Sequence, residues 1–359
     1  MIFDDVLEIK NGRNQKAVEN PDGKYPIYGS GGVMGRADDY ICDAETVVIG
    51  RKGNINKPIF VEEPFWNVDT AFGLEANKSL LLPRYLYYFC VHYDFEKHNK
   101  TVTIPSLTKA DLLKIQINVP SLAEQKYIVD KLQLIERIIG GRKKELDTLD
   151  QLIKARFVEM FGDPADISRK DKVELSEICE KITDGEHGSV ARVPNGHPFL
   201  NAKQILKNGR IDWDTITYVG DEDHQRIYKR CNPVEGDILL TTTGTIGNVA
   251  IMPKAEEVSM DRGITLIKID RQKVTSEFVA ELLKQPSIQT EMGVNVHASA
   301  IGHLFMNRVK KLPAILPSME SQAEFTAFVR QVDKSKSVVK KSLDETQLLF
   351  DSLMQKYFG

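Results

Sequence analysis

A heptad pattern of apolar residues runs through residues 121–162 and returns at residues 318–359. Eight of the ten seam positions in the first copy are apolar, and the ten are Ile128, Leu132, Ile135, Ile139, Arg142, Leu146, Leu149, Ile153, Arg156 and Met160. Adding 197 to each number gives a second seam, from Phe325 to Tyr357, in which eight of ten positions are again apolar. This spacing predicts helices that pack along another helix. At ~1.5 Å per residue each would be ~60 Å long, so we expect the two to bury their seams on each other.

Other landmarks keep the same offset of 197 residues. The pairs are Pro120 with Pro317, Ser121 with Ser318, Gln125 with Gln322, and Phe161-Gly162 with Phe358-Gly359. Ser121 followed by Glu124 forms a capping box, which places the start of the first helix at residue 121. We interpret the shared register as an internal duplication; the alternative for either copy alone is a buried helix of an ordinary globular domain. Gly140-Gly141 costs roughly 1 kcal/mol per glycine in a helix interior, and we expect a bend or break there.

The segments before the two helices, 1–120 and 163–317, alternate short apolar runs with glycine-bearing turns. This pattern is typical of mostly-β modules. The run VVIGRKGNI aligns with LLTTTGTIG through Gly53 and Gly244, and TIPSL aligns with AIGHL through Leu107 and Leu304. The sequence therefore predicts an α+β fold with an internal pseudo-twofold repeat. Its four parts are residues 1–120, 121–162, 163–317 and 318–359, a β module and a long helix in each copy.

Charge and motifs argue against several classes of function. The chain has 48 basic and 51 acidic side chains, so it lacks the basic surface of a protein that grips DNA tightly alone. It has neither a signal peptide nor an apolar run long enough to span a membrane, and we expect a cytoplasmic protein. The four cysteines and seven histidines show no metal-ligand spacing, so we expect no metal site.

Catalytic motifs are equally weak. Gly29, Gly31 and Gly35 form GxGxxxG, but a strand-like segment follows instead of the helix that a dinucleotide site needs. The sequence has no GxxxxGK[ST] loop for ATP and no convincing cluster of nuclease carboxylates. We therefore predict no catalytic residue and no cofactor in this chain. A stand-alone enzyme would need an acid, base or nucleophile constellation that the sequence does not offer.

The aligned glycine loops carry side chains of the kinds that contact base edges and phosphates. Arginine and lysine suit guanine, asparagine suits adenine, and threonine suits phosphate or the thymine methyl group. The bland alternative is that these are ordinary turn residues. We predict that double-stranded DNA is contacted by Arg51, Lys52, Asn54, Lys57, Lys100, Thr101, Thr242, Thr243, Thr245, Asn248, His297 and Ser299.

These features resemble one family, the specificity subunits of type I restriction-modification systems. The resemblance spans essentially the whole chain. It is carried by YPIYGSGGVMG leading into VVIGRKGNI, by GDILLTTTGTIGNVAI, which pairs with that first segment, and by the helix openings NVPSLAEQKYIVDKL and LPAILPSMESQAEFTAFV. It implies two target recognition domains, each reading one half of a bipartite DNA sequence. It also implies that the two long helices pack as an antiparallel coiled coil.

The resemblance further implies a non-catalytic subunit that acts through partners. Two modification subunits would supply S-adenosylmethionine and the adenine-N6 methyltransferase site, and restriction subunits would add ATP- and Mg-dependent cleavage. We expect the helices to fix the spacing of the half-sites and to dock the modification subunits through Gln125, Arg142, Arg156 and Gln322. The alternative function is a non-enzymatic coiled-coil scaffold whose β modules bind protein or glycan.

Overall fold

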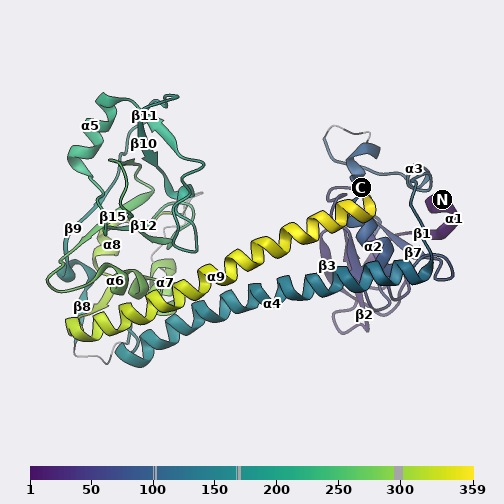
Figure 1. Ribbon diagram of the computed structural model, residues 1–359, viewed down its shortest axis with the longest axis horizontal. Helices are drawn as coiled ribbons and strands as arrows, with labels where there is room; N and C mark the ends of the chain where they lie inside the picture. The colour runs from purple at the N-terminus through teal and green to yellow at the C-terminus, as the bar shows by residue number, and fades with distance from the viewer. Residues whose placement is uncertain (100, 102, 167, 169–170, 295–301) are drawn as a thin grey trace. The chain divides into compact units, whose positions relative to one another are not determined.

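The computed structural model describes the chain except for residues 100, 102, 167, 169–170 and 295–301. It divides into two compact units (Figure 1). Unit 1 comprises residues 1–144 and 340–359, and unit 2 comprises residues 145–339. Each unit therefore contains one β-rich module and one part of each long helix.

Unit 1 has a four-stranded antiparallel sheet in the order β1-β7-β4-β5. These strands are β1 (Leu7–Asn11), β7 (Ala71–Ala76), β4 (Thr46–Gly50) and β5 (Ile59–Val61). Beside it, β2 (Tyr25–Gly29) pairs antiparallel with β3 (Gly32–Ala37) and parallel with β6 (Trp66–Asn67). The short helices are α1 (Phe3–Val6), η1 (Gln15–Ala17), α2 (Pro83–His92), η2 (Phe95–His98) and α3 (Lys109–Leu112).

Unit 2 has the same order of corresponding strands. Its four-stranded sheet is β9 (Cys179–Asp184), β15 (Ile264–Ile269), β12 (Ile238–Thr241) and β13 (Val249–Ile251). Here β10 (His197–Leu200) pairs antiparallel with β11 (Thr217–Val219) and parallel with β14 (Ser259–Met260). A further antiparallel pair joins β8 (Lys172–Glu174) to β16 (Pro313–Ile315). The short helices are η3 (Leu175–Ile178), η4 (Ala202–Gln204), α5 (Asp221–Arg230), α6 (Ser276–Leu283), α7 (Pro286–Val294) and α8 (Met306–Lys310).

Two 40-residue helices are drawn in teal and yellow in Figure 1, α4 (Leu122–Phe161) and α9 (Met319–Phe358). The helix predicted at 121–162 is confirmed, and all ten predicted seam positions of α4 are buried or half-buried. The backbone N–H of Glu124 donates to Ser121 Oγ at 3.3 Å, and that of Ser321 donates to Ser318 Oγ at 3.2 Å. These side-chain caps satisfy donors that a helix start leaves unpaired, so each helix begins where its serine stands.

The expected break at Gly140-Gly141 is wrong, because α4 continues through both residues. A Cβ on either glycine would meet open space, so the glycines lie on the outer face of α4 and not in its seam. The cost of roughly 1 kcal/mol per glycine is small beside the burial of Ile139 and Leu132 on the preceding turns, which holds the helix together.

Each unit buries its parts of the two helices in its own core. In unit 1, Ile128 and Leu132 from the start of α4 share a core with Met354 near the end of α9. In unit 2, Phe157 near the end of α4 shares a core with Phe325 from the start of α9, and the two rings lie edge to face with centroids 5.5 Å apart. The module in each unit is therefore packed directly onto the helices.

Candidate nucleic-acid interface

In unit 1, the glycine loop after β4 is tied to the segment that precedes α3. The backbone N–H of Leu107 donates to the Arg51 carbonyl at 2.9 Å, and that of Gly53 donates to the Pro105 carbonyl at 3.0 Å. Lys52 and Ser106 pair as an isolated antiparallel bridge between these hydrogen bonds. Gly53 has φ of +81°, a conformation that favours glycine and turns the chain directly after Lys52.

Unit 2 repeats this arrangement after β12. The backbone N–H of Leu304 donates to the Thr242 carbonyl at 2.9 Å, and that of Gly244 donates to the Gly302 carbonyl at 3.4 Å. Thr243 and His303 form the bridge, and Gly244 has φ of +75°. Gly53 and Gly244, and likewise Leu107 and Leu304, therefore make equivalent backbone contacts in their own units. We call the glycine loop and the segment tied to it the loop pair of each unit.

In each unit, the turn that follows the first strand of the sheet is hydrogen-bonded to a short parallel strand, β6 in unit 1 and β14 in unit 2. The backbone N–H of Arg13 donates to the Asn67 carbonyl at 2.8 Å, and that of Glu186 donates to the Met260 carbonyl at 2.9 Å. The preceding glycines allow this approach. A Cβ on Gly12 would lie 1.8 Å from the Val68 carbonyl oxygen, and a Cβ on Gly185 would lie 2.2 Å from the Met260 carbonyl oxygen.

The side chains predicted to contact DNA in unit 1 are accessible. Lys52, Asn54, Lys57 and Thr101 are exposed. Arg51 is half-buried, with its guanidinium 5.7 Å from the centre of the Phe72 ring. Lys100 lies outside the described residues. The loop pair of unit 1 therefore presents cationic and amide side chains around one turn.

In unit 2 the predicted residues divide into accessible and structural ones. Thr245 is exposed and Thr243 is half-buried. Thr242 was predicted to contact DNA, but only 1% of it is exposed, so its side chain is not accessible. Its backbone N–H donates to the Gly263 carbonyl at 2.8 Å. Asn248 is half-buried, and its amide donates to the Ile205 carbonyl at 2.8 Å, which ties two loops together. His297 and Ser299 lie outside the described residues.

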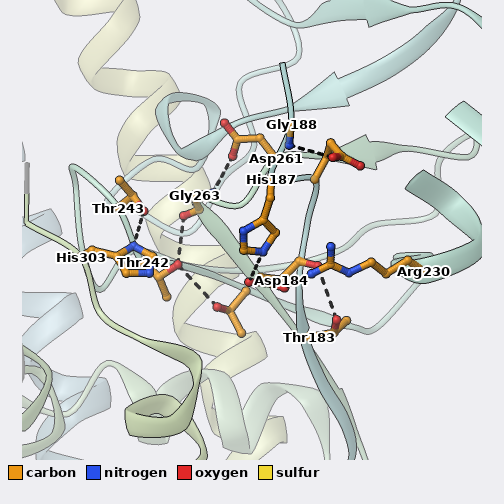
Figure 2. A network of polar contacts seen from close by, with 12 residues as sticks. Thr183, Asp184, His187, Gly188, Arg230, Thr242, Thr243, Asp261, Gly263 and His303 are labelled. Carbon is orange, nitrogen blue, oxygen red and sulfur yellow. Dashed lines mark hydrogen bonds and ion pairs between the residues drawn. The ribbon is translucent and has the colours of Figure 1, made fainter. Parts of the chain in front are cut away.

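A polar network that sequence reasoning missed surrounds the loop pair of unit 2 (Figure 2). Thr243 Oγ1 and His303 Nδ1 are 2.7 Å apart, and His187 Nε2 lies 2.7 Å from a carboxylate oxygen of Asp184. Arg230, from the last turn of α5, donates to the other Asp184 oxygen. The only signal in the sequence was the alignment of AIGHL with TIPSL, which places His303 opposite Ser106.

Electrostatics set the protonation states in this network. Burial lowers the pKa of His303 below its ordinary value of 6.5, and the nearby Arg262 cation lowers it further. A hydrogen bond from the Gly188 backbone holds the pKa of Glu186 below its usual range, with help from the Arg226 guanidinium. The network at neutral pH therefore contains a neutral imidazole and an ionised carboxylate.

Comparison with known proteins identifies this arrangement. The family described as type I restriction modification DNA specificity domain matches residues 3–149 and 170–346. The chain belongs to this family. It is a specificity subunit of a type I restriction-modification system, a DNA-recognition subunit and not a catalytic one.

Individual relatives agree over most of the chain. The specificity subunit is 22% identical over 354 residues to the EcoBI specificity subunit of Escherichia coli, which covers 89% of this chain and 74% of that protein. It is 22% identical to a putative specificity subunit of Haemophilus influenzae, over 99% of this chain and 92% of the relative. The fold matches the crystal structure of an S subunit from M. genitalium with a TM-score of 0.58 and 17% identity, over 100% of this chain and 95% of that one. The alternative function, a scaffold for protein or glycan, has no support among these relatives.

Two of the residues predicted to dock partners in the specificity subunit are interior residues. Gln125 and Gln322 are 0% exposed. Gln125 Nε2 donates to the Leu80 and Pro120 carbonyls at 2.8 and 2.9 Å, and its Oε1 accepts from the Leu82 backbone at 2.8 Å. Gln322 makes the same three hydrogen bonds with Lys273, Pro317 and Thr275, at 2.9, 3.0 and 2.9 Å. Both amides therefore fasten a module to a helix and offer no surface to a partner.

The other two predicted docking residues lie on the helices with part of their side chains accessible. Arg142 is half-buried on α4. Arg156 is also half-buried, and it donates to Glu159 and to Glu324 of α9, each at 2.9 Å. Beside Arg156 in unit 2 is a shallow groove of about 600 Å³ lined by Leu152, Ala155, Arg156, Glu159 and Phe328.

Within the part of the specificity subunit that the structure describes, no group of three or more His, Cys, Asp or Glu side chains is placed to hold a metal ion. The four cysteines are unpaired, and burial raises the pKa of each thiol, to about 12 for Cys42, Cys179 and Cys231. Over the same described residues, a search for a helix both long and apolar enough to cross a bilayer finds none.

Proposed function

We propose that the modules at residues 1–120 and 163–317 are two target recognition domains, each reading one half of a bipartite DNA sequence. The observation that carries this proposal is the loop pair, which has the same backbone hydrogen bonds in both units but different side chains at its tip. A shared frame with variable side chains is suited to holding two readers in equivalent geometry while their sequence preferences differ. The common strand order of the two units supports an internal duplication with pseudo-twofold symmetry.

The helices at 121–162 and 318–359 form, in this proposal, an antiparallel coiled coil that sets the spacing of the half-sites. Support comes from within each unit. In unit 1 the start of α4 shares a core with the end of α9, and in unit 2 the end of α4 shares a core with the start of α9. The Lys336 ammonium lies 2.6 Å from an Asp150 carboxylate oxygen, which sets the register of the pair in unit 2.

The specificity subunit acts in this proposal within a larger cytoplasmic complex. Two modification subunits supply S-adenosylmethionine and adenine-N6 methylation, and restriction subunits supply ATP- and Mg-dependent cleavage. With 48 basic against 51 acidic side chains, the subunit alone releases few counterions on binding DNA, so the positive surface comes from the partners. We expect weak DNA binding by the isolated subunit at physiological salt.

An apolar stripe on the helices is the docking surface that we propose for the modification subunits, in place of the buried glutamines. In unit 1, Tyr127, Leu134 and Ile138 of α4 are 55%, 55% and 42% exposed. Their spacing of seven and four residues places them on one face of the helix. In unit 2, Leu152 is 47% exposed at the groove beside Arg156. Exposed apolar side chains aligned along a helix are typical of an interface with another helix.

A matched deletion tests the role of the helices. Residues 142–148 and 339–345 are corresponding heptads of the two helices, at the offset of 197 residues. Deleting both segments removes one heptad from each helix and leaves the remaining seams in phase, because Ile139 is then followed by Leu149 and Lys336 by Thr346. The helices become shorter by ~10 Å, equivalent to ~3 base pairs.

The readout is methylation of a DNA library with randomised spacers by the assembled complex. We expect both half-site sequences to stay unchanged while the preferred spacer becomes shorter. Deleting only one of the two segments is the control, since it leaves one heptad unpaired and should reduce assembly. An active double-deletion complex that keeps the original spacer would refute this role.

A further inference from the structure

Two residues at the tip of each loop pair form the backbone bridge, and the family assignment gives their side chains no role. We propose that these two positions determine which base each module prefers: Lys52 with Ser106 in unit 1, and Thr243 with His303 in unit 2. This inference rests on the proposed function and names the residues that carry it out. In unit 2 it assigns the reading atom to the His303 imidazole, held in place by Thr243.

The backbone N–H groups around these positions are already hydrogen-bonded within the protein. In unit 2 the N–H groups of Leu304 and Gly244 donate across the loop pair, and Leu304 is fully buried beneath it. In unit 1 the N–H groups of Leu107 and Gly53 do the same, and Leu107 is 2% exposed. Because the main chain is held by these hydrogen bonds and by the buried leucines, the side chains of the bridged residues are the groups that can face a ligand.

Space lies open in front of both positions. A Cβ on Gly244 would meet nothing within 4 Å, and a Cβ on Gly53 would meet only Ser30 Oγ, at 3.9 Å. The two glycines are therefore needed for their positive φ and do not fill a packed interior. A glycine turn without a side chain lets a duplex approach the neighbouring bridged residue closely.

The imidazole of His303 is oriented from two sides. Thr243 Oγ1 is 2.7 Å from Nδ1, and the Phe305 ring packs edge to face with the imidazole, at a centroid distance of 4.8 Å and an interplanar angle of 81°. Figure 2 shows His303 and Thr243 side by side at the edge of the polar network. The Thr243 hydroxyl can donate to Nδ1 or accept from it, so this contact orients the ring in either tautomer of the neutral imidazole and leaves Nε2 as the ring atom that can meet a ligand.

The donors and acceptors on a base edge determine which side-chain groups can bond to it. In the major groove, guanine presents acceptors, cytosine presents a donor, and adenine presents one of each. The Nε2 of a neutral imidazole offers one hydrogen bond, as a donor or as an acceptor according to its tautomer, so its base preference differs from that of a side chain that only donates. Unit 1 has Ser106 in the place of His303 and Lys52 in the place of Thr243, and the lysine ammonium only donates and suits guanine. The two modules thus hold different chemistry at equivalent points of one frame.

The test uses the assembled modification complex and a DNA library in which both half-sites are randomised one base at a time. The variants are His303→Gln, Thr243→Val and the two combined. We expect each single variant to change the base preference about tenfold at one position, the same position for both, within a single half-site. The double variant should change little more than either single one, because the two residues act as a unit.

A control separates reading from folding. Thr290→Val removes an exposed hydroxyl that bonds only to its own helix, at the Pro286 carbonyl, and should leave every base preference unchanged. The reciprocal variant, Lys52→Thr with Ser106→His, should change one position of the other half-site and leave the first half-site as it was.

The outcomes distinguish this inference from the proposed function. If the wild-type complex methylates a bipartite target but the His303 and Thr243 variants lose methylation equally on all sequences, the pair is structural and the inference is overturned. If both half-sites change together, it is also overturned. A wild-type complex that shows no bipartite target contradicts the proposed function itself.

Discussion

The loop pairs of the two units share a backbone but differ in chemistry. In unit 1 the tip presents Arg51, Lys52 and Asn54, without a carboxylate bonded to them. In unit 2 the tip presents threonines and a histidine, and the adjoining turn carries carboxylates that are occupied by Arg226 and Arg230. Hydrogen bonds between main-chain atoms define the frame, so side chains at its tip can differ without altering it. Stability therefore resides in the main-chain hydrogen bonds and sequence preference in the side chains at the tip. Substitutions in either group test this division.

The largest effect should come from removing the buried glutamine amide that connects each module to a long helix. Gln125→Leu and Gln322→Leu each leave three backbone groups without the hydrogen bonds that the glutamine amide makes. We expect each to lower the free energy of unfolding of its own unit by about 3 kcal/mol. Urea denaturation of the full chain measures this, with the exposed Gln151→Leu and Gln331→Leu as controls. Comparable losses support equivalent anchors; a loss for one alone would show that the two units are held differently.

The next effect should come from the turns beside the loop pairs. Gly12→Ala and Gly185→Ala each place a Cβ within about 2 Å of a carbonyl oxygen, so the backbone has to shift. We expect a loss of about 2 kcal/mol in each case, the usual cost of overpacking a tight site. Thermal unfolding measures it. Gly220→Ala is the matched control, since its Cβ would meet open space, and an equal effect of all three substitutions would argue against the close approach.

A smaller effect, of opposite sign, should distinguish the two helices. Gly140→Ala and Gly141→Ala in α4 meet open space and should each stabilise the chain by about 1 kcal/mol, through helix propensity. Ser337→Ala, at the corresponding place in α9, should gain less, because serine is already a better helix former than glycine. Chemical denaturation gives the ranking. Destabilisation by the glycine replacements would mean that the helix requires those residues.

The smallest effect should be the dependence on pH that His303 gives to unit 2. The folded pKa of His303 is lowered from 6.5, by burial, by Arg262 and by His187, with Asp184 acting in the opposite direction. As pH falls below 6.5 the unfolded chain takes up this proton first, so unit 2 loses stability until pH reaches the lowered folded pKa. Below that pH, His303 is a cation and the base preference of its half-site should change. Methylation profiles over a series of decreasing pH from 7.5 show this, and His303→Gln should abolish that change. The other half-site, with Ser106 in this position, should stay the same.

The features that the sequence predicted correctly are those with a local signature. The heptad seam of α4 and the serine caps each carry a pattern within a few residues. The failures involve contacts between distant residues. Gln125 is anchored by Leu80 and Leu82, which lie more than forty residues away, and Thr243 meets His303 across sixty. A polar residue on a predicted helix looks like a surface residue until its partners are known. Gly140-Gly141 failed for a related reason, because packing on adjacent turns outweighs local propensity.

The most direct test of the account compares one substitution in each loop pair. Asn54 and Thr245 follow the positive-φ glycines of units 1 and 2, and both are exposed. Methylation of a randomised library by complexes carrying Asn54→Ala or Thr245→Ala reports both half-sites at once. The account predicts that each variant relaxes a different half-site, by ~1–3 kcal/mol where the side chain contacts a base directly, and leaves the other half-site unchanged. Relaxation of the same half-site by both variants, or of both half-sites by either one, would contradict it.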